Sequence, residues 1–396
     1  MAILSQPRRL GELVTFKTGK LDSNAAVPNG KYPFFTCSQE TLRTNTFSFD
    51  TECVLLAGNN ANGIFPLKFF KGKFDAYQRT YVVRPLNVDG LATKYLYYAL
   101  RPKLDELRSF STGAATKFLT LTILNETEIA VPPLPIQRRI AAILSAYDDL
   151  IENSQRRIKI LEEMARRLYR EWFVHFRFPG HEDCRFVDSP LGEIPEGWEV
   201  KTVDDSFEIL GGGTPSRKED AYWVEVSINW FSPTDLTGAG TMFMDDSRDH
   251  ITPLGLSESS ARLFPPFCVM LTSRATIGAI AINTTEACTN QGFITCLPSR
   301  EVPLYFLHSW LKENVPTFVR MASGSTFKEI SRGVFKPICF LHPQADLVQM
   351  FESFAAPIGE EMLGLQRQIQ ILRRTRDLLL PRLLSSQIDV EALDHA

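Results

Sequence analysis

The chain has 396 residues, of which 44% are apolar and 22% charged, and its formal net charge is −3. This length accommodates two or three domains, each with its own core. The N-terminal ten residues carry two arginines and no apolar segment, and no run of eighteen apolar residues occurs anywhere, so we expect a cytoplasmic protein without a secretory signal or membrane span. Seven scattered cysteines without a CxxC pair and six histidines without ligand spacing argue against a disulfide framework and a zinc site.

Residues 1–131 are expected to form the first globular domain, of mixed α/β type. Two β-branched and apolar runs, "CVLLAG" (53–58) and "TYVVRP" (80–85), are separated by turn-forming residues and predict strands. An amphipathic helix is expected over 93–108. This part holds 16 basic and 11 acidic residues, a net charge of +5.

Residues 132–181, with a net charge of +3, predict a long helix. Pro135 suits a first helical position, and "FPGHED" (178–183) is expected to end the helix. Apolar residues recur in steps of four and three, which is typical of a coiled coil. The expected seam positions are Ile140, Ile143, Leu150, Ile158, Leu161 and Leu168.

Residues 182–342 are expected to form a second globular domain, with a net charge of −8. It contains the predicted strands "CVMLTS" (268–273) and "GFITCLP" (292–298) and a predicted helix over 303–320. "GGGTPS" (211–216) lacks the GxGxxG spacing of a dinucleotide site and is expected to be a tight turn.

Residues 343–396, with a net charge of −3, predict a second long helix. Its expected seam positions are Phe351, Phe354, Ile369, Leu372 and Leu379. At 1.5 Å per residue, about 40 residues form a rod of roughly 60 Å.

The two halves of the chain repeat each other. "STGAATKFL" (111–119) aligns with "ASGSTFKEI" (322–330), which pairs Gly113 with Gly324 and Lys117 with Lys328. The repeat predicts an α/β (α+β) fold of two similar globular domains, each followed by a long helix. We expect the two helices to form an antiparallel coiled coil with pseudo-two-fold symmetry. The alternative is that each helix covers its own domain.

Motifs for catalysis are missing. There is no phosphate-binding loop, and "FPPF" (264–267) places Phe264 where an amino-methyltransferase motif needs a polar residue. We therefore expect a binding protein with no catalytic residue and no metal site.

Several polar residues are candidates for contacts with DNA. A lysine after a glycine loop can neutralise a phosphate, an arginine can bind phosphate or guanine, and an amide can recognise an adenine edge. Surface or turn roles fit the same residue types. The candidates are Lys117, Lys328, Arg79, Arg274, Asn290, Gln291, Arg217 and Lys218.

Five segments together resemble a known family. They are "VPPLPIQRRIAAILSAYDDLIENSQRRIKILEEMARRLYREWF" (131–173), "GEIPEGWEV" (192–200), "GGGTPS" (211–216), "SRATIG" (273–278) and "TNQGF" (289–293). With the order globular part, helix, globular part, helix, the chain resembles the specificity subunit (HsdS) of type I restriction–modification enzymes.

The resemblance implies that 1–131 and 182–342 are target recognition domains, each binding one half of a bipartite site in double-stranded DNA. It implies that the helical regions 132–181 and 343–396 set the spacer and dock two methyltransferase subunits, through which restriction subunits join. Catalysis, S-adenosylmethionine, ATP and Mg are then expected on those partners, with no cofactor on this chain. Because the two domains differ in sequence, the site is expected to be asymmetric. The rival hypotheses are a fused enzyme and a two-headed coiled-coil scaffold or adaptor that does not recognise DNA.

Two features fit this hypothesis poorly. The second domain is acidic, so its basic residues must gather on one face or its DNA binding must depend on the assembled enzyme. In addition, Arg274 in "SRATIG" has no arginine counterpart in the aligned "AGNNANG" (57–63) of the first copy.

Overall fold

The computed structural model describes residues 7–61, 63–113, 116–223, 227–324 and 327–390. The chain divides into unit 1, formed by Met1–Glu152 and Gln370–Ala396, and unit 2, formed by Asn153–Ile369. Each unit therefore contains one globular part and a portion of both long helices, whereas the sequence suggested separate helical regions. No helix within the described ranges has both the length and the apolar character needed to cross a membrane.

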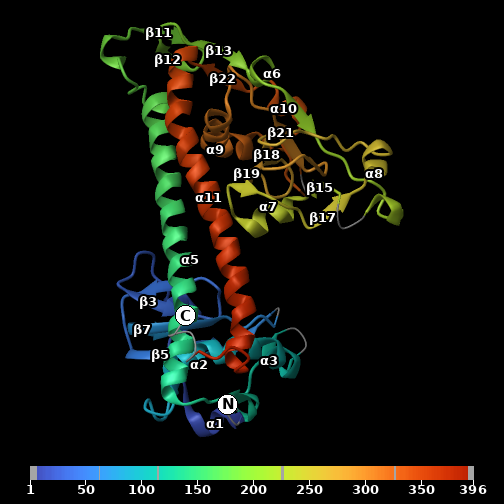
Figure 1. The fold of residues 1–396 in the computed structure, drawn as a ribbon. Coiled ribbons are helices and arrows are strands. Elements are labelled where there is room, and N and C mark those ends of the chain that lie inside the picture. Colours follow the sequence, from blue (N-terminus) through green and yellow to red (C-terminus); the bar gives the residue numbers. More distant parts are fainter. Residues whose placement is uncertain (1–6, 62, 114–115, 224–226, 325–326, 391–396) are drawn as a thin grey trace. The chain divides into compact units, whose positions relative to one another are not determined.

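Unit 1 is built around a six-stranded sheet (Figure 1). Its neighbours are antiparallel except for one parallel pair, between β3 and β7. The predicted strands are confirmed: "CVLLAG" falls in β5 up to Ala57 and "TYVVRP" is β8, and these two strands lie side by side in the sheet. In sheet order the strands are β2 (Val14–Thr18), β8 (Thr80–Pro85), β5 (Phe49–Ala57), β7 (Leu67–Ala76), β3 (Tyr32–Phe35) and β4 (Leu42–Thr44).

The helix predicted over 93–108 is interrupted. Helix α2 (Thr93–Leu100) passes into a single 3-10 turn at Arg101–Lys103, and α3 (Leu104–Phe110) follows. Pro102 in that turn has no N–H to donate and so removes one α-helical hydrogen bond at the break. The corresponding helix of unit 2, α9 (Leu304–Met321), is continuous as predicted.

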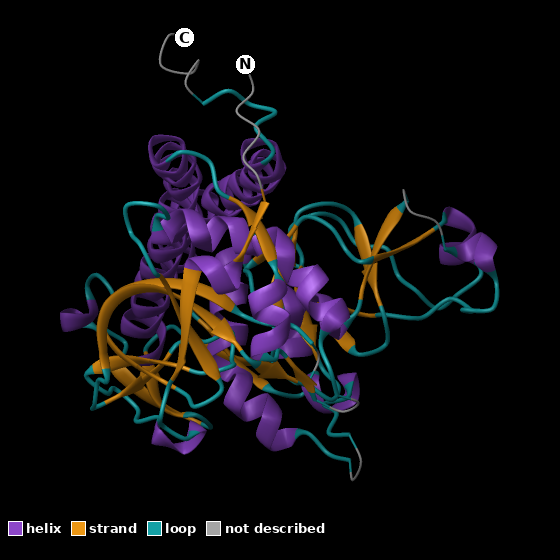
Figure 2. Ribbon diagram, turned by 90° about the horizontal axis from the view of Figure 1, so that it is seen from below, coloured by secondary structure: helices purple, strands orange, loops and turns teal. Residues whose placement is uncertain are grey.

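Unit 2 contains a five-stranded sheet and a smaller three-stranded sheet. The predicted strands are confirmed as β18 and β21. In order, the larger sheet has β14 (Ile209–Gly211), β21 (Phe293–Cys296), β18 (Val269–Thr272), β19 (Ile280–Asn283) and β16 (Phe243–Met244). The smaller sheet has β17 (Asp249–Ile251), β15 (Ile228–Phe231) and β20 (Ala287–Thr289), accompanied by α7 (Pro233–Ala239) and α8 (Pro253–Ser257). Figure 2 shows this mixture of strands and helices.

The repeat extends to the register of the strands. In sequence, "VLLAGNNANG" (54–63) aligns with "VMLTSRATIG" (269–278) and "VVRP" (82–85) with "TCLP" (295–298), which pairs Val54 with Val269 and Val83 with Cys296. In the structure Val54 lies opposite Val83 in the β5–β8 pair, and Val269 lies opposite Cys296 in the β18–β21 pair, so the two pairs have the same register. In both sheets the next strand beyond this pair joins a parallel neighbour, β3 on β7 and β16 on β19. A strand near the start of each copy also pairs with the last strand of that copy, β1 (Pro7–Arg9) with β10 (Glu128–Ala130) and β13 (Glu199–Thr202) with β22 (Cys339–His342).

Two long helices follow the globular parts, α5 (Leu134–Tyr169) and α11 (Ala345–Leu384). In unit 1 the beginning of α5 packs on the end of α11, where Asp148 accepts a hydrogen bond from Arg376. In unit 2 the end of α5 packs on the beginning of α11, with the Tyr169 ring against Phe351. The helix segments are thus antiparallel within each unit, as expected (Figure 1).

The packing of these helices differs in detail from the predicted seam. Leu150 is 51% exposed, whereas the adjacent Ile151 is only 6% exposed. Leu144, which is fully buried, lies seven residues before Ile151, and the half-buried Ile158 lies seven residues after it, so the seam keeps one heptad phase through this part of α5. Phe354 is 54% exposed and lies at the margin of the seam, where its ring still contacts Trp172. Of the other expected positions, Ile140, Phe351 and Ile369 are buried, and Ile143, Ile158, Leu161, Leu168, Leu372 and Leu379 are half-buried.

Candidate functional site

In unit 1 three distant segments meet where the central strand β5 ends. The N–H of Gly58 donates to the carbonyl of Arg79 (2.8 Å), and the N–H of Leu119 donates to the carbonyl of Gly58 (2.9 Å). The short strands β6 (Asn59–Asn60) and β9 (Lys117–Phe118) pair immediately beside these bonds. We call this place the strand-end site of unit 1; it comprises 58–60, 77–80, 112–113 and 116–119.

Unit 2 has the same arrangement at the end of β18. The N–H of Ser273 donates to the carbonyl of Gly292 (2.8 Å), and the N–H of Ile330 donates to the carbonyl of Ser273 (2.9 Å). Arg274 forms a bridge with Glu329 at the position of the β6–β9 pair. The strand-end site of unit 2 comprises 273–275, 289–293, 323–324 and 327–330.

A glycine turn precedes Lys117 in the first copy and Lys328 in the second. Gly113 and Gly324 have φ angles of +107° and +123°. A Cβ atom on Gly113 would lie 2.0 Å from the Thr116 carbonyl oxygen, and one on Gly324 would lie 2.3 Å from that of Phe327. Only glycine fits either turn. Residues 114–115 and 325–326, which belong to the aligned repeat segments, lie outside the described residues.

Each strand-end site carries one ammonium and one guanidinium group. Within the described part of the chain, neither Lys117, half-buried, nor Lys328, exposed, forms an ion pair. The Arg79 guanidinium lies 5.5 Å from the centre of the Phe118 ring. Arg274 Nε lies 3.7 Å from a carboxylate oxygen of Glu329. Such a pair of cations beside exposed backbone is suited to binding an anion.

The glycine triplet packs against the segment that carries Asn290 and Gln291. The Thr214 hydroxyl donates to the Gln291 side-chain oxygen (2.6 Å), and the Asn290 side-chain oxygen accepts from the N–H of Gly292 (2.8 Å). A Cβ atom on Gly212 would lie 2.1 Å from the Asn290 carbonyl oxygen. The expectation of a tight turn is wrong, because Gly211 ends strand β14 and residues 212–216 continue without forming a turn. The glycines are needed for close approach of two chain segments.

Arg217 and Lys218 have other surroundings. The Arg217 guanidinium lies 3.6 Å from the centre of the Trp223 ring and 2.6 Å from a carboxylate oxygen of Asp249. It therefore ties a loop to β17, at the edge of the smaller sheet. Lys218 is exposed and forms no ion pair within the described ranges.

A further basic residue of unit 2 lies close to its strand-end site. Arg332, at the start of α10 (Arg332–Phe335), lies against Gly211, which pairs with Ile294 in the larger sheet. Arg274, Lys328 and Arg332 thus come from neighbouring segments.

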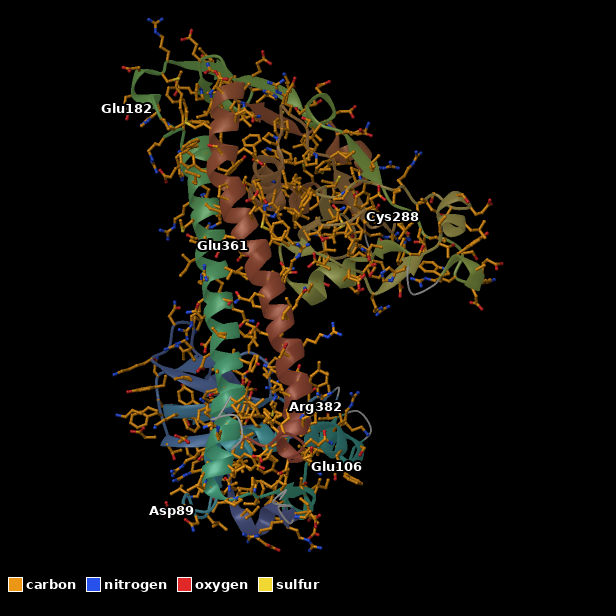
Figure 3. The ribbon with its side chains drawn as sticks, viewed as in Figure 1. Asp89, Glu106, Glu182, Cys288, Glu361 and Arg382 are labelled. Atoms are coloured by element: carbon orange, nitrogen blue, oxygen red, sulfur yellow. The ribbon has the colours of Figure 1, made fainter. Side chains whose placement is uncertain are left out.

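The thiols offer no reactive group in the cores. Burial raises the pKa of Cys53 and of Cys288 (labelled in Figure 3) to about 12, so both remain protonated at neutral pH. Across the described ranges, no group of three or more His, Cys, Asp or Glu side chains is placed to hold a metal ion.

A cavity of about 440 Å³ lies within unit 2 among α5, α7, α9 and α11. Its lining includes His308, whose pKa is lowered to about 3 by burial and by the nearby Lys312. The Nε2 atom of His308 is buried without a hydrogen-bond partner. The cavity therefore holds a neutral imidazole beside the ionisable side chains of Glu162, Lys312 and Glu313.

Known proteins resemble this chain in sequence and in fold. Residues 4–163 and 195–346 match the family described as "Type I restriction modification DNA specificity domain". The MjaIX specificity subunit of Methanocaldococcus jannaschii is 28% identical over 313 residues, which are 77% of this chain and 71% of that protein. The EcoDI specificity subunit of Escherichia coli is 32% identical over 219 residues, 50% of this chain and 48% of that protein. The S subunit from M. genitalium has the same fold, with a TM-score of 0.65 at 17% identity, covering 96% of this chain and 95% of that one.

Gly212→Ala is expected to lower the free energy of unfolding of unit 2 by about 1–3 kcal/mol, because the added Cβ forces two backbone segments apart. Urea unfolding followed by tryptophan fluorescence measures this, since all five tryptophans lie in unit 2. Gly238→Ala on α7 is the control: its Cβ meets no atom within 4 Å, and stability should be unchanged or rise by up to about 1 kcal/mol. Equal effects of the two substitutions would contradict the close-approach explanation.

His308 is expected to make unit 2 less stable as the pH falls below 6.5. The folded pKa of about 3 lies below the ordinary value of 6.5, so between these values the unfolded chain binds a proton that the folded chain does not. His308→Gln should remove up to about 1.4 kcal/mol per pH unit from the slope of stability against pH. Urea unfolding between pH 6.5 and about 4 tests this, with the exposed His175→Gln as control. An unchanged slope in His308→Gln would refute it.

Proposed function

The chain belongs to the family of type I restriction modification DNA specificity domains, and from this premise we propose how it serves as the specificity subunit of a type I restriction–modification complex. Each unit binds one half of a bipartite, asymmetric site in double-stranded DNA. The chain directs the methyltransferase and restriction subunits to that site. The helix segments set the number of unrecognised base pairs between the halves.

One observation carries this proposal. The two units share strand register and turn geometry, yet they carry different side chains at equivalent places of their strand-end sites. A homodimer would present identical surfaces and favour a palindrome. Two related but different surfaces in one chain fit two different half-sites.

The partners and cofactors follow from the same proposal. Two methyltransferase subunits bind the helical segments, and restriction subunits join through them. S-adenosylmethionine, ATP and Mg belong to those partners, which supply the chemistry of adenine methylation and DNA cleavage. Exposed apolar side chains on α5 and α11 support such docking; they include Leu150, Ile160, Met164, Ile371 and Leu378. The complex works where its DNA substrate is, in the cytoplasm.

Deleting the gene for this chain should abolish adenine methylation at one split, asymmetric motif. Single-molecule sequencing of genomic DNA, with and without the gene, measures this directly. The gene for the partner methyltransferase is left intact as the control, and complementation with the full chain should restore the same motif. Unchanged methylation would contradict the proposed role as a specificity subunit. Binding of partner proteins without any DNA affinity would favour the scaffold alternative.

Lengthening the helices should change the spacer and leave both half-sites intact. Four residues inserted into α5 between 145 and 165 add about 6 Å of helix, enough for one or two base pairs. Mapping the methylated motif in the variant measures the spacer. A matched insertion into the exposed hairpin loop at 190–191, between β11 (Phe186–Ser189) and β12 (Gly192–Pro195), should leave the motif unaltered. Altered half-sites in the helix variant would contradict a ruler function.

A further inference from the structure

The two strand-end sites obtain their guanidinium group from different places in the chain. Matched backbone hydrogen bonds make Gly58 equivalent to Ser273 and Leu119 equivalent to Ile330. By the same bonds, Asn59 stands where unit 2 has Arg274, whereas Arg79 stands where unit 2 has Gly292. Each unit thus has one arginine at these two positions. In unit 1 the arginine is at the second position (Arg79), and in unit 2 it is at the first (Arg274).

The two arginines nevertheless reach the same neighbour. Arg79 lies over the ring of Phe118, and Arg274 lies beside the carboxylate of Glu329. Phe118 pairs with Asn59 in β6–β9, and Glu329 pairs with Arg274 in the bridge, so Phe118 and Glu329 are equivalent.

Gly292, which has no side chain, leaves room for Arg274 at the neighbouring position. A Cβ atom on Gly292 would lie 3.8 Å from the Cβ of Arg274, so the two positions are direct neighbours. The side chain that Arg79 supplies in unit 1 is missing in unit 2, and Arg274 occupies the neighbouring position.

We propose that Arg79 and Arg274 are equivalent DNA-phosphate anchors, which act with Lys117 and Lys328 and do not select bases. This inference rests on the proposed function of the chain. It explains why the lone arginine of "SRATIG" has no counterpart in the aligned segment of the first copy.

Phosphate is favoured over a base by the comparison of the two units. A feature that two domains keep while binding different half-sites has to serve what those half-sites share, which is the phosphate backbone. The lysine at the end of the glycine turn is likewise present in both. In addition, Glu329 approaches Arg274 through Nε at 3.7 Å, which leaves both terminal nitrogens of the guanidinium available for an anion.

The test moves the guanidinium group of unit 1 from position 79 to position 59, which is equivalent to Arg274 of unit 2. The full chain is assembled with its methyltransferase partners. The affinity of this complex for DNA that contains the motif it methylates is then measured from 50 to 200 mM salt. Arg79→Gly should reduce the slope of log affinity against log salt by about 0.9, the loss of one phosphate contact. The ratio of the wild-type affinity to the Arg79→Gly affinity should therefore fall about threefold between 50 and 200 mM salt. The double variant Arg79→Gly with Asn59→Arg should recover the wild-type slope.

Controls separate the anchor from general effects of charge and folding. Lys71→Gln removes one positive charge at the far end of the β5–β7 pair, where Lys71 lies opposite Glu52, and should leave the slope unchanged. Arg79→Gln keeps the bulk of the side chain and should reproduce the effect of Arg79→Gly even if the glycine variant is unstable.

The proposal is overturned if both Arg79 variants keep the wild-type slope, if the double variant fails to recover it, or if sequencing shows a changed methylation motif in any of them. A wild-type complex that methylates no specific motif would instead refute the proposed function itself, so the two failures are distinguishable.

Discussion

Both units depend on two backbone hydrogen bonds made by the residue that follows the central strand, Gly58 in unit 1 and Ser273 in unit 2. Its N–H donates to one loop and its carbonyl accepts from another, so a single peptide position ties two distant segments to the sheet. Buried backbone groups must be paired. A change in either loop would leave such a group unpaired, and the geometry of the strand-end sites is therefore fixed by the main chain. Side chains on this frame can differ between the units without altering it.

The helices provide the second constraint, since each unit is closed by portions of both. In unit 1 Gln137 of α5 is pinned by hydrogen bonds to the backbone of Ala92, Gly90 and Pro132. In unit 2 Gln366 of α11 binds both backbone groups of Phe243 in the edge strand β16. Glu361 of α11, labelled in Figure 3, forms an ion pair with Arg157 of α5. The core of unit 1 also includes Leu380 and Leu383 of α11, and the core of unit 2 includes Tyr169 of α5, so neither globular part is completed by its own stretch of sequence alone.

The sequence predicted the architecture well because the repeat exposes it. The sequence offset pairs Gly113 with Gly324, and both residues have a positive φ angle in the structure. A glycine at both positions predicted this, because a Cβ atom would clash in either turn. Long-range packing left no comparable signal. The burial of Ile151 in place of Leu150 depends on which face of α5 is covered in the fold, and these adjacent residues are equally apolar. The stacking of Arg217 on Trp223 joins residues whose approach only the folded loop determines.

Net charge is a poor guide to where this chain can bind an anion. At physiological salt, exposed charges are screened beyond about 8 Å, so only the local arrangement matters. Many carboxylates of the acidic second domain are already paired, as Asp249 is with Arg217, Asp245 with Arg367 and Asp204 with Lys336. Lys328 has no such partner in the described part of the chain. A domain with a net charge of −8 can therefore present positive charge at its strand-end site while remaining acidic elsewhere.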